Sequence, residues 1–250
     1  MTPGGTPLVA VAHGSRDPRA AATVARLMDA VRALRPDVPV HTSFLDHCPP
    51  APGPVLDGLA DAGAASAVVL PLLLTAAYHS KHDVPAVLRA ADSRLDLVTA
   101  RTLGPHPLLT AALERRLREV DVEIGDPGTA VVLTAAGSSD PTANATIAGL
   151  ARRWRRRGWR GVVAAYASAT RPTPGEAVAA LRDAGVPRVV VASYFLAPGF
   201  FTDKVRDEAL AAGAAAVSPA LGDAPELAEL VVYRYERALM DARLGLAAAV

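Results

Sequence analysis

The chain carries one strand–helix pattern twice, and this repetition restricts its possible folds more than any other feature of the sequence. Short apolar, β-branched runs alternate with longer Ala-rich stretches of helical periodicity, four of each in each half. Such alternation predicts parallel sheets with helices on both faces and right-handed crossovers. We therefore expect an α/β protein with two similar lobes, each a four-stranded parallel sheet flanked by helices.

Matching residues in the two halves indicate an internal duplication. The segment Gly14–Pro18 (GSRDP) returns as Gly137–Pro141 (GSSDP), and Leu103–Pro107 (LGPHP) returns as Leu221–Pro225 (LGDAP). We divide the chain into an N-terminal lobe, residues 1–122, and a C-terminal lobe, residues 123–250, joined by a polar stretch. Strands are expected near 8–12, 40–45, 67–73, 95–100, 130–135, 162–166, 188–194 and 215–218, and helices near 19–34, 54–62, 84–91, 107–119, 143–156, 174–184, 203–212 and 225–240.

The first strand ends in polar residues suited to ligand binding. His13 follows the apolar run 8–12, and ligands of open α/β sheets bind beyond the carboxyl ends of the strands, where the strand order reverses. Gly14 permits a tight turn, and Ser15 can cap the helix that begins near Pro18. A core or helix-capping histidine is the alternative interpretation of His13.

The segment after the third strand changes from apolar to small to polar residues and contains His79. If the strand order is 2-1-3-4, the first and third strands are neighbours about 4.8 Å apart, and His13 faces His79. Two neutral imidazoles can hold a divalent metal and leave other coordination positions open, as catalysis requires. Tyr78 can present a ring face to a flat ligand.

The second strand ends at Asp46, which is a candidate third metal ligand or proton acceptor. A solvated turn residue or a helix cap is an equally good interpretation of Asp46. The neighbouring His47 and Cys48 lie beside prolines in an expected turn, and we assign structural roles to both.

Composition excludes several other classes of protein. The net charge of +1 gives no electrostatic footprint for nucleic acid. A single cysteine rules out an internal disulfide, and no apolar run reaches the roughly 18 residues of a membrane span. The first residues lack the features of a secretion signal. We therefore expect a cytoplasmic protein that binds neither nucleic acid nor membrane.

Two enzyme signatures are missing from the sequence. There is no G-x-x-x-x-G-K-[ST] loop, so we expect no requirement for ATP. There is no G-x-S-x-G turn either, which argues against the α/β hydrolase reading that His13-Gly14 suggests.

Taken together, these motifs resemble those of the sirohydrochlorin chelatase family, class II. The resemblance rests on Ala12–Arg16, Phe44–Asp46, Pro71–Pro85 and, in the second half, Ser193–Gly199, and it extends over nearly the whole chain. It implies a lyase that inserts Fe²⁺, or alternatively Co²⁺, into sirohydrochlorin for siroheme or cobalamin biosynthesis. The metal is a substrate, and no organic cofactor is implied.

The resemblance also implies roles for individual residues. His13 and His79 match the two metal-binding, catalytic histidines of the family, and Asp46 falls where family members often carry glutamate. In the second half Ala136 and Phe201 replace the two histidines, so that half is expected to bind no metal.

Sirohydrochlorin is a flat ring that carries carboxylates, which suit charge-assisted hydrogen bonds. We nominate a set of turn residues for substrate binding: Ser15, Arg16, Tyr78, Ser80, Lys81 and Arg171. The competing hypothesis is a carrier that holds a metal or tetrapyrrole without turnover. Because two lobes are already fused in one chain, a monomer is expected.

Overall fold

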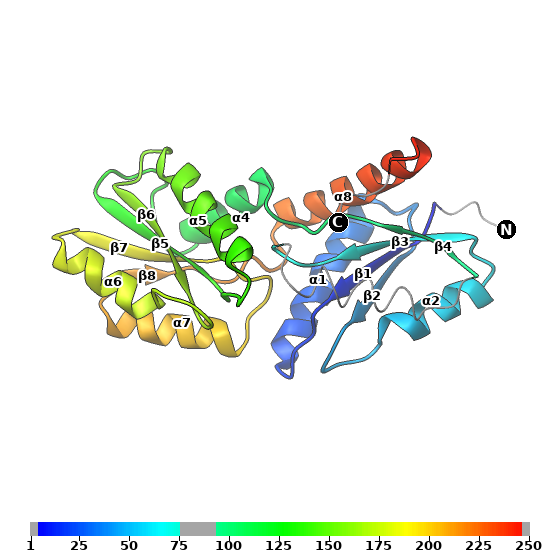
Figure 1. The fold of residues 1–250 in the computed structure, drawn as a ribbon, viewed down its shortest axis with the longest axis horizontal. Helices are drawn as coiled ribbons and strands as arrows, with labels where there is room; N and C mark the ends of the chain where they lie inside the picture. Colours follow the sequence, from blue (N-terminus) through cyan, green and yellow to red (C-terminus); the bar gives the residue numbers. More distant parts are fainter. Residues whose placement is uncertain (1–4, 76–93, 247–250) are drawn as a thin grey trace. The chain divides into compact units, whose positions relative to one another are not determined.

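The structure is a computed structural model, and it describes residues 5–75 and 94–246 (Figure 1). Its first sheet is parallel, as expected, and has the strand order β2-β1-β3-β4, which is the order on which the sequence analysis made the approach of His13 and His79 conditional. The strands are β1 (Leu8–Ala12), β2 (Val40–Phe44), β3 (Ser66–Pro71) and β4 (Asp96–Thr99), and the helices between them are α1 (Pro18–Leu34) and α2 (Pro52–Asp61).

The second sheet repeats this topology as β6-β5-β7-β8, again parallel. The strands are β5 (Thr129–Ala135), β6 (Gly161–Tyr166), β7 (Arg188–Ser193) and β8 (Ala216–Val217), and the helices are α4 (Pro107–Arg118), α5 (Pro141–Arg155), α6 (Pro174–Asp183), α7 (Phe200–Ala211) and α8 (Pro225–Arg243). Every expected element in the described ranges is present, and its ends lie within three residues of the expected ones. The helix expected near 84–91 lies outside the described residues.

Alternating side chains of the central strands build each core, as a buried parallel sheet requires. In the first sheet, Val9 and Val11 of β1 pack with Leu56 and Leu59 of α2, and all four are buried. In the second sheet, Val132, Val191 and their neighbours form a corresponding cluster. These rigid layers fix the positions of the loops at the carboxyl ends of the strands.

The compact units of the structure do not coincide with the two sequence repeats, because the last helix of each repeat belongs to the unit of the other repeat. The first unit comprises Met1–Gly104 and Pro225–Val250, and the second comprises Pro105–Ala224. Helix α8 therefore packs on α1, β3 and β4, whereas α4 packs on β7. The division at 122/123 follows the sequence repeat, and the units depart from it because the fourth helix of each repeat packs on the sheet of the other repeat.

Helix α4 is tied to the second unit by a buried polar contact. Glu114 is only 5 % exposed, and its Oε1 accepts a hydrogen bond of 3.0 Å from the indole Nε1 of Trp154 in α5. The guanidinium of Arg157 lies 3.3 Å from the same oxygen. An unpaired indole N–H in this position would carry the full cost of its desolvation.

We expect Glu114→Ala to lower the free energy of unfolding by about 1–3 kcal/mol, because it leaves that buried donor without an acceptor. Urea denaturation measures the loss. Glu119→Ala, at the exposed end of the same helix, is the matched control and should cost less than ~1 kcal/mol. Equal losses in the two variants would contradict the role given to the Glu114–Trp154 hydrogen bond.

Candidate functional site

The carboxyl end of β1 leads directly into the N-terminus of α1, as the sequence predicted. The carboxylate of Asp17 accepts a hydrogen bond of 2.9 Å from the backbone N–H of Arg19, and the Ser15 hydroxyl accepts one of 3.0 Å from the N–H of Asp17. Hydrogen bonds from Arg19 hold the pKa of the Asp17 carboxyl below its usual range. This capping fixes the turn that carries His13, and the His13 side chain is exposed.

A backbone hydrogen bond joins this turn to the loop after β2. The N–H of Asp46 donates to the carbonyl oxygen of His13 at 2.9 Å, which extends the β1–β2 ladder past the end of the strands. Gly14, next to His13, has a φ of +93°, and a Cβ on it would lie 1.8 Å from the backbone carbonyl oxygen of Asp46. Only glycine therefore lets the two loops approach so closely.

His47 lies beside His13, although the sequence analysis gave it a structural role. The ring centroids of the two histidines are 6.2 Å apart and their planes are at 74°. The His47 backbone N–H donates to Asp46 Oδ1 at 2.7 Å, and His47 Nε2 lies 3.4 Å from Asp46 Oδ2. The structure thus gathers two imidazoles and one carboxylate at the carboxyl end of β1 and β2.

The separation of the two rings is close to that of two imidazoles bound to one metal ion. At metal–nitrogen distances of about 2.0–2.1 Å, two imidazoles on one cation have centroids roughly 5–6 Å apart. Within residues 5–75 and 94–246, no group of three or more His, Cys, Asp or Glu side chains is arranged as a complete metal site. By their ring separation alone, His13 and His47 are two possible nitrogen ligands, and further ligands would be needed to complete a site.

The second unit contains the same loop without these side chains. The N–H of Ser168 donates to the Ala136 carbonyl oxygen at 2.9 Å, as Asp46 does to His13, and Gly137 has a positive φ of +84°. Ala169 has a φ of +62°, close to the +67° of His47. Because alanine adopts the left-handed conformation at the equivalent place, the loop does not need an imidazole at position 47 to fold.

The remaining nominated residues have different surroundings. Arg16 is exposed on the turn after His13. Arg171 belongs to the second unit, where it is exposed and forms an ion pair with Glu176. Four nominated residues lie outside the described residues, namely Tyr78, His79, Ser80 and Lys81. The pairing of His13 with His79 therefore stays a prediction.

Aromatic residues near the start of α7 separate into buried and exposed sets. Tyr194 and Phe195 belong to the core of the second unit, and burial raises the pKa of the Tyr194 hydroxyl. Phe200 and Phe201 are 75 % and 38 % exposed, with ring centroids 5.6 Å apart. The exposed pair offers apolar area to a ligand, whereas the buried pair does not.

Comparison with known proteins gives a family match over most of the chain. The profile of the CbiX family matches residues 7–120 and again residues 130–238, which agrees with the internal duplication. A sirohydrochlorin cobaltochelatase of Priestia megaterium is 29% identical over 207 residues, which is 79% of this chain and 66% of that protein. The chain thus spans just under two thirds of the length of this relative.

A sirohydrochlorin ferrochelatase of Bacillus subtilis is 28% identical over 204 residues, or 79% of this chain and 77% of that protein. Among solved structures, SirB from Bacillus subtilis with Fe³⁺ superimposes with a TM-score of 0.84, at 22% identity, over 97% of this chain and 98% of that one. A structure of SirB in complex with cobalt superimposes with a TM-score of 0.80 at 20% identity, over 96% and 98% of the two chains. At these identities, the structural likeness establishes the fold.

Proposed function

The chain belongs to the CbiX family, and on that basis we propose that it inserts a divalent metal, Fe²⁺ or Co²⁺, into sirohydrochlorin without ATP. Relatives that carry either metal activity in their names support this reaction. We further propose that the protein works in the cytoplasm as a monomer. In the part of the chain that is described, no helix is long and apolar enough to cross a membrane.

One observation carries the proposal most strongly. The two repeats share the same loop geometry, but only the first carries His13, Asp46 and His47, where the second carries Ala136, Ser168 and Ala169. Folding alone therefore does not explain the imidazoles and the carboxylate in the first repeat. Nitrogen and oxygen ligands of this kind suit first-row divalent metals.

The reaction exchanges two pyrrole N–H protons for one divalent cation, so the site must hold the metal and accept protons. We propose that His13 and His79 bind the metal, with Asp46 supplying negative charge. Once the metal has passed to the ring, the freed imidazole nitrogens can accept the two departing pyrrole protons, because a histidine pKa lies near neutrality. Ser15, Arg16 and Arg171, with the residues nominated near His79, would hold the carboxylates of the ring.

The assay that tests this function follows the absorption of sirohydrochlorin with the purified chain and each metal in turn. We expect metallation well above the uncatalysed rate with Fe²⁺ or Co²⁺, and the faster metal identifies the physiological one. Rates equal to those without protein, for both metals, would contradict the proposed function.

His47→Ala should weaken Co²⁺ binding by about 10–100-fold, which is the usual effect of losing a group that supports a metal ligand. The loop should keep its fold, because Ala169 occupies the equivalent position in the second repeat. Titration with Co²⁺, followed by its visible absorption, gives the affinity. Unchanged affinity in His47→Ala would remove His47 from the site and leave the roles of His13 and Asp46 to be tested separately.

A further inference from the structure

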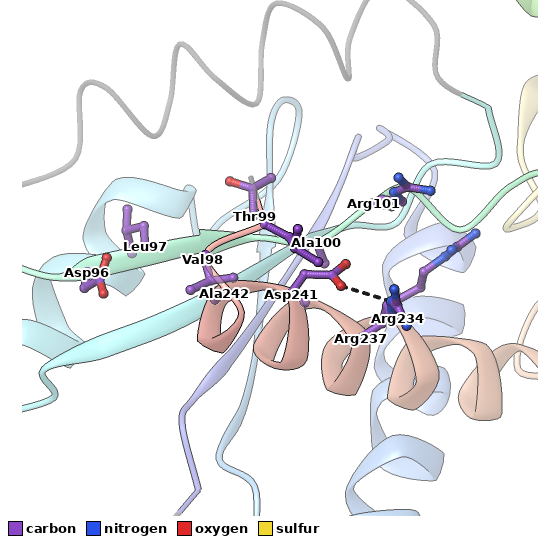
Figure 2. Close-up of a pocket in the computed structure, with 13 residues that line it drawn as sticks. Asp96, Leu97, Val98, Thr99, Ala100, Arg101, Arg234, Arg237, Asp241 and Ala242 are labelled. Atoms are coloured by element: carbon purple, nitrogen blue, oxygen red, sulfur yellow. Dashed lines mark ion pairs between the residues drawn. The ribbon is translucent and has the colours of Figure 1, made fainter. Parts of the chain in front are cut away.

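The first unit has a groove between the edge strand β4 and helix α8, with a volume of about 490 Å³ (Figure 2). This volume is within the roughly 300–1,000 Å³ of typical small-molecule sites. Its lining contains neither His13 nor Asp46 nor His47. Figure 2 shows the side chains of β4 on one side and those of α8 on the other. The groove is therefore a separate concave feature of the unit.

The groove combines three arginines with apolar walls. Arg101 follows β4, and Arg234 and Arg237 extend from α8, while Val98 and Ala238 belong to the apolar part of the lining. The carboxylate of Asp241 forms an ion pair with Arg237, with Oδ1 3.1 Å from Nε, although this buried oxygen accepts no hydrogen bond (Figure 2). Apart from Asp241, the only other acidic residue of the lining is Asp96.

Arg234 is half-buried and the least exposed of the three arginines. Its NH2 donates to the carbonyl oxygen of Leu103 at 3.0 Å, but its Nε is buried and has no hydrogen-bond partner. Burial lowers the pKa of the Arg234 guanidinium, and the positive charge of Arg101 lowers it further. A buried donor without an acceptor is destabilising, and more so when it is charged. The native protein therefore keeps an unfavourable group in the wall of this groove.

In the second unit, groups of the protein itself satisfy the equivalent arginine. Arg116, which is equivalent to Arg234, donates from Nε and NH2 to the Leu221 carbonyl oxygen, at 3.1 and 2.9 Å. Its guanidinium also contacts two carboxylates, Asp223 at 3.0 Å and Glu119 at 2.8 Å. Carboxylates of the protein itself thus neutralise the charge of Arg116.

Arg234, in the first unit, lacks both of these carboxylates. Pro105 stands at the position equivalent to Asp223, and Arg237 stands at the position equivalent to Glu119. One carboxylate near the arginine is thus replaced by a neutral residue and the other by a positive charge. Arg101 adds a third positive charge, and it has no hydrogen-bond or ion-pair partner among residues 5–75 and 94–246. The space around Arg234 that corresponds to the two carboxylates beside Arg116 is therefore open to an anion from outside the protein.

We propose that the groove between β4 and α8 binds an organic anion through a carboxylate, with Arg234 and Arg101 as its ligands and an apolar part against Val98 and Ala238. Arginine suits this role because its planar fork matches a carboxylate and remains charged. A free small carboxylic acid and a carboxylate side chain of the tetrapyrrole have the same chemistry, so the test must separate these two sources.

Isothermal titration of the full chain with succinate and with citrate tests the binding. We expect saturable binding that weakens at least tenfold in Arg101→Ala, an exposed residue whose loss leaves the core intact, and in Arg237→Glu, which copies Glu119 of the second unit. Arg152→Ala, an exposed arginine of α5, is the matched control and should bind as the native chain does. The proposal is overturned if neither acid binds, if inorganic phosphate binds but the acids do not, or if all four proteins bind equally.

Steady-state metallation by the same variants separates the two sources of the carboxylate. A higher KM for the tetrapyrrole in Arg101→Ala and Arg237→Glu, with kcat unchanged, identifies the carboxylate as the substrate's own. Unchanged KM and kcat, together with weakened succinate binding, identify a free acid. The titration does not need a metal or an active enzyme, so its result stands even if the proposed chelatase function fails.

Discussion

His13→Ala should lower the rate of metal insertion by about 10²–10⁴-fold, the range expected for a group that transfers protons in catalysis. The residue is exposed beyond the end of β1, so its loss removes no core contact. Initial rates of metallation, measured from the absorption of the ring with excess metal, give the effect. We expect a similar loss in His79→Ala from the sequence motif alone.

His41→Ala is the matched control for this experiment, since His41 is a partly buried histidine within β2 rather than beyond its carboxyl end. It should keep the native rate. If His13→Ala retained near-native activity while folding normally, the carboxyl end of β1 would not be the reactive centre.

Gly14→Ala should cost about 3–5 kcal/mol of the free energy of unfolding. A residue other than glycine pays about 1–2 kcal/mol for a left-handed conformation, and here the new methyl group would also lie 1.8 Å from the Asp46 oxygen. Strain of this kind is among the few causes of large single-site losses. Urea denaturation of the native and variant chains measures the difference.

Two further glycines separate strain from function. Gly63 has a φ of +85° and open space around its Cβ position, so Gly63→Ala should cost only about 1–2 kcal/mol. Gly137→Ala repeats the clash in the second unit, 2.0 Å from the Ser168 oxygen, and should cost as much as Gly14→Ala. Only Gly14→Ala should also weaken Co²⁺ binding in the folded protein. Equal Co²⁺ affinity in the two variants would contradict the assignment of the metal to the first repeat.

The layout of the sheets was accessible from the sequence because periodicity and turn residues carry it. The position of His13 at the carboxyl end of β1 was predicted and is confirmed, and the strand order 2-1-3-4, which the sequence analysis took as a condition, is the one observed. The exchange of α4 and α8 was not predicted. An apolar stripe predicts that one face of a helix is buried, as it does for Leu109, Leu113 and Leu117 of α4. It does not predict which of two similar sheets that face packs against.

The proximity of His47 to His13 was also missed, for a different reason. It depends on the left-handed backbone at His47 and on the hydrogen bond between Asp46 and His13, which join residues far apart in the sequence. A signal was nonetheless present, because the duplicated half places alanine at the equivalent positions 136 and 169. A residue-by-residue alignment of the two repeats shows that both His13 and His47 are replaced by alanine in the second repeat, which was expected to bind no metal.

The number of metallated rings formed per protein chain tests the central claim most directly. With sirohydrochlorin and Co²⁺ or Fe²⁺ both in large excess, the account predicts many turnovers per native chain and fewer than one per His13→Ala chain over the same time. Formation of no more than one product per native chain would indicate a carrier, and equal turnover in the two proteins would show that His13 does not carry the chemistry.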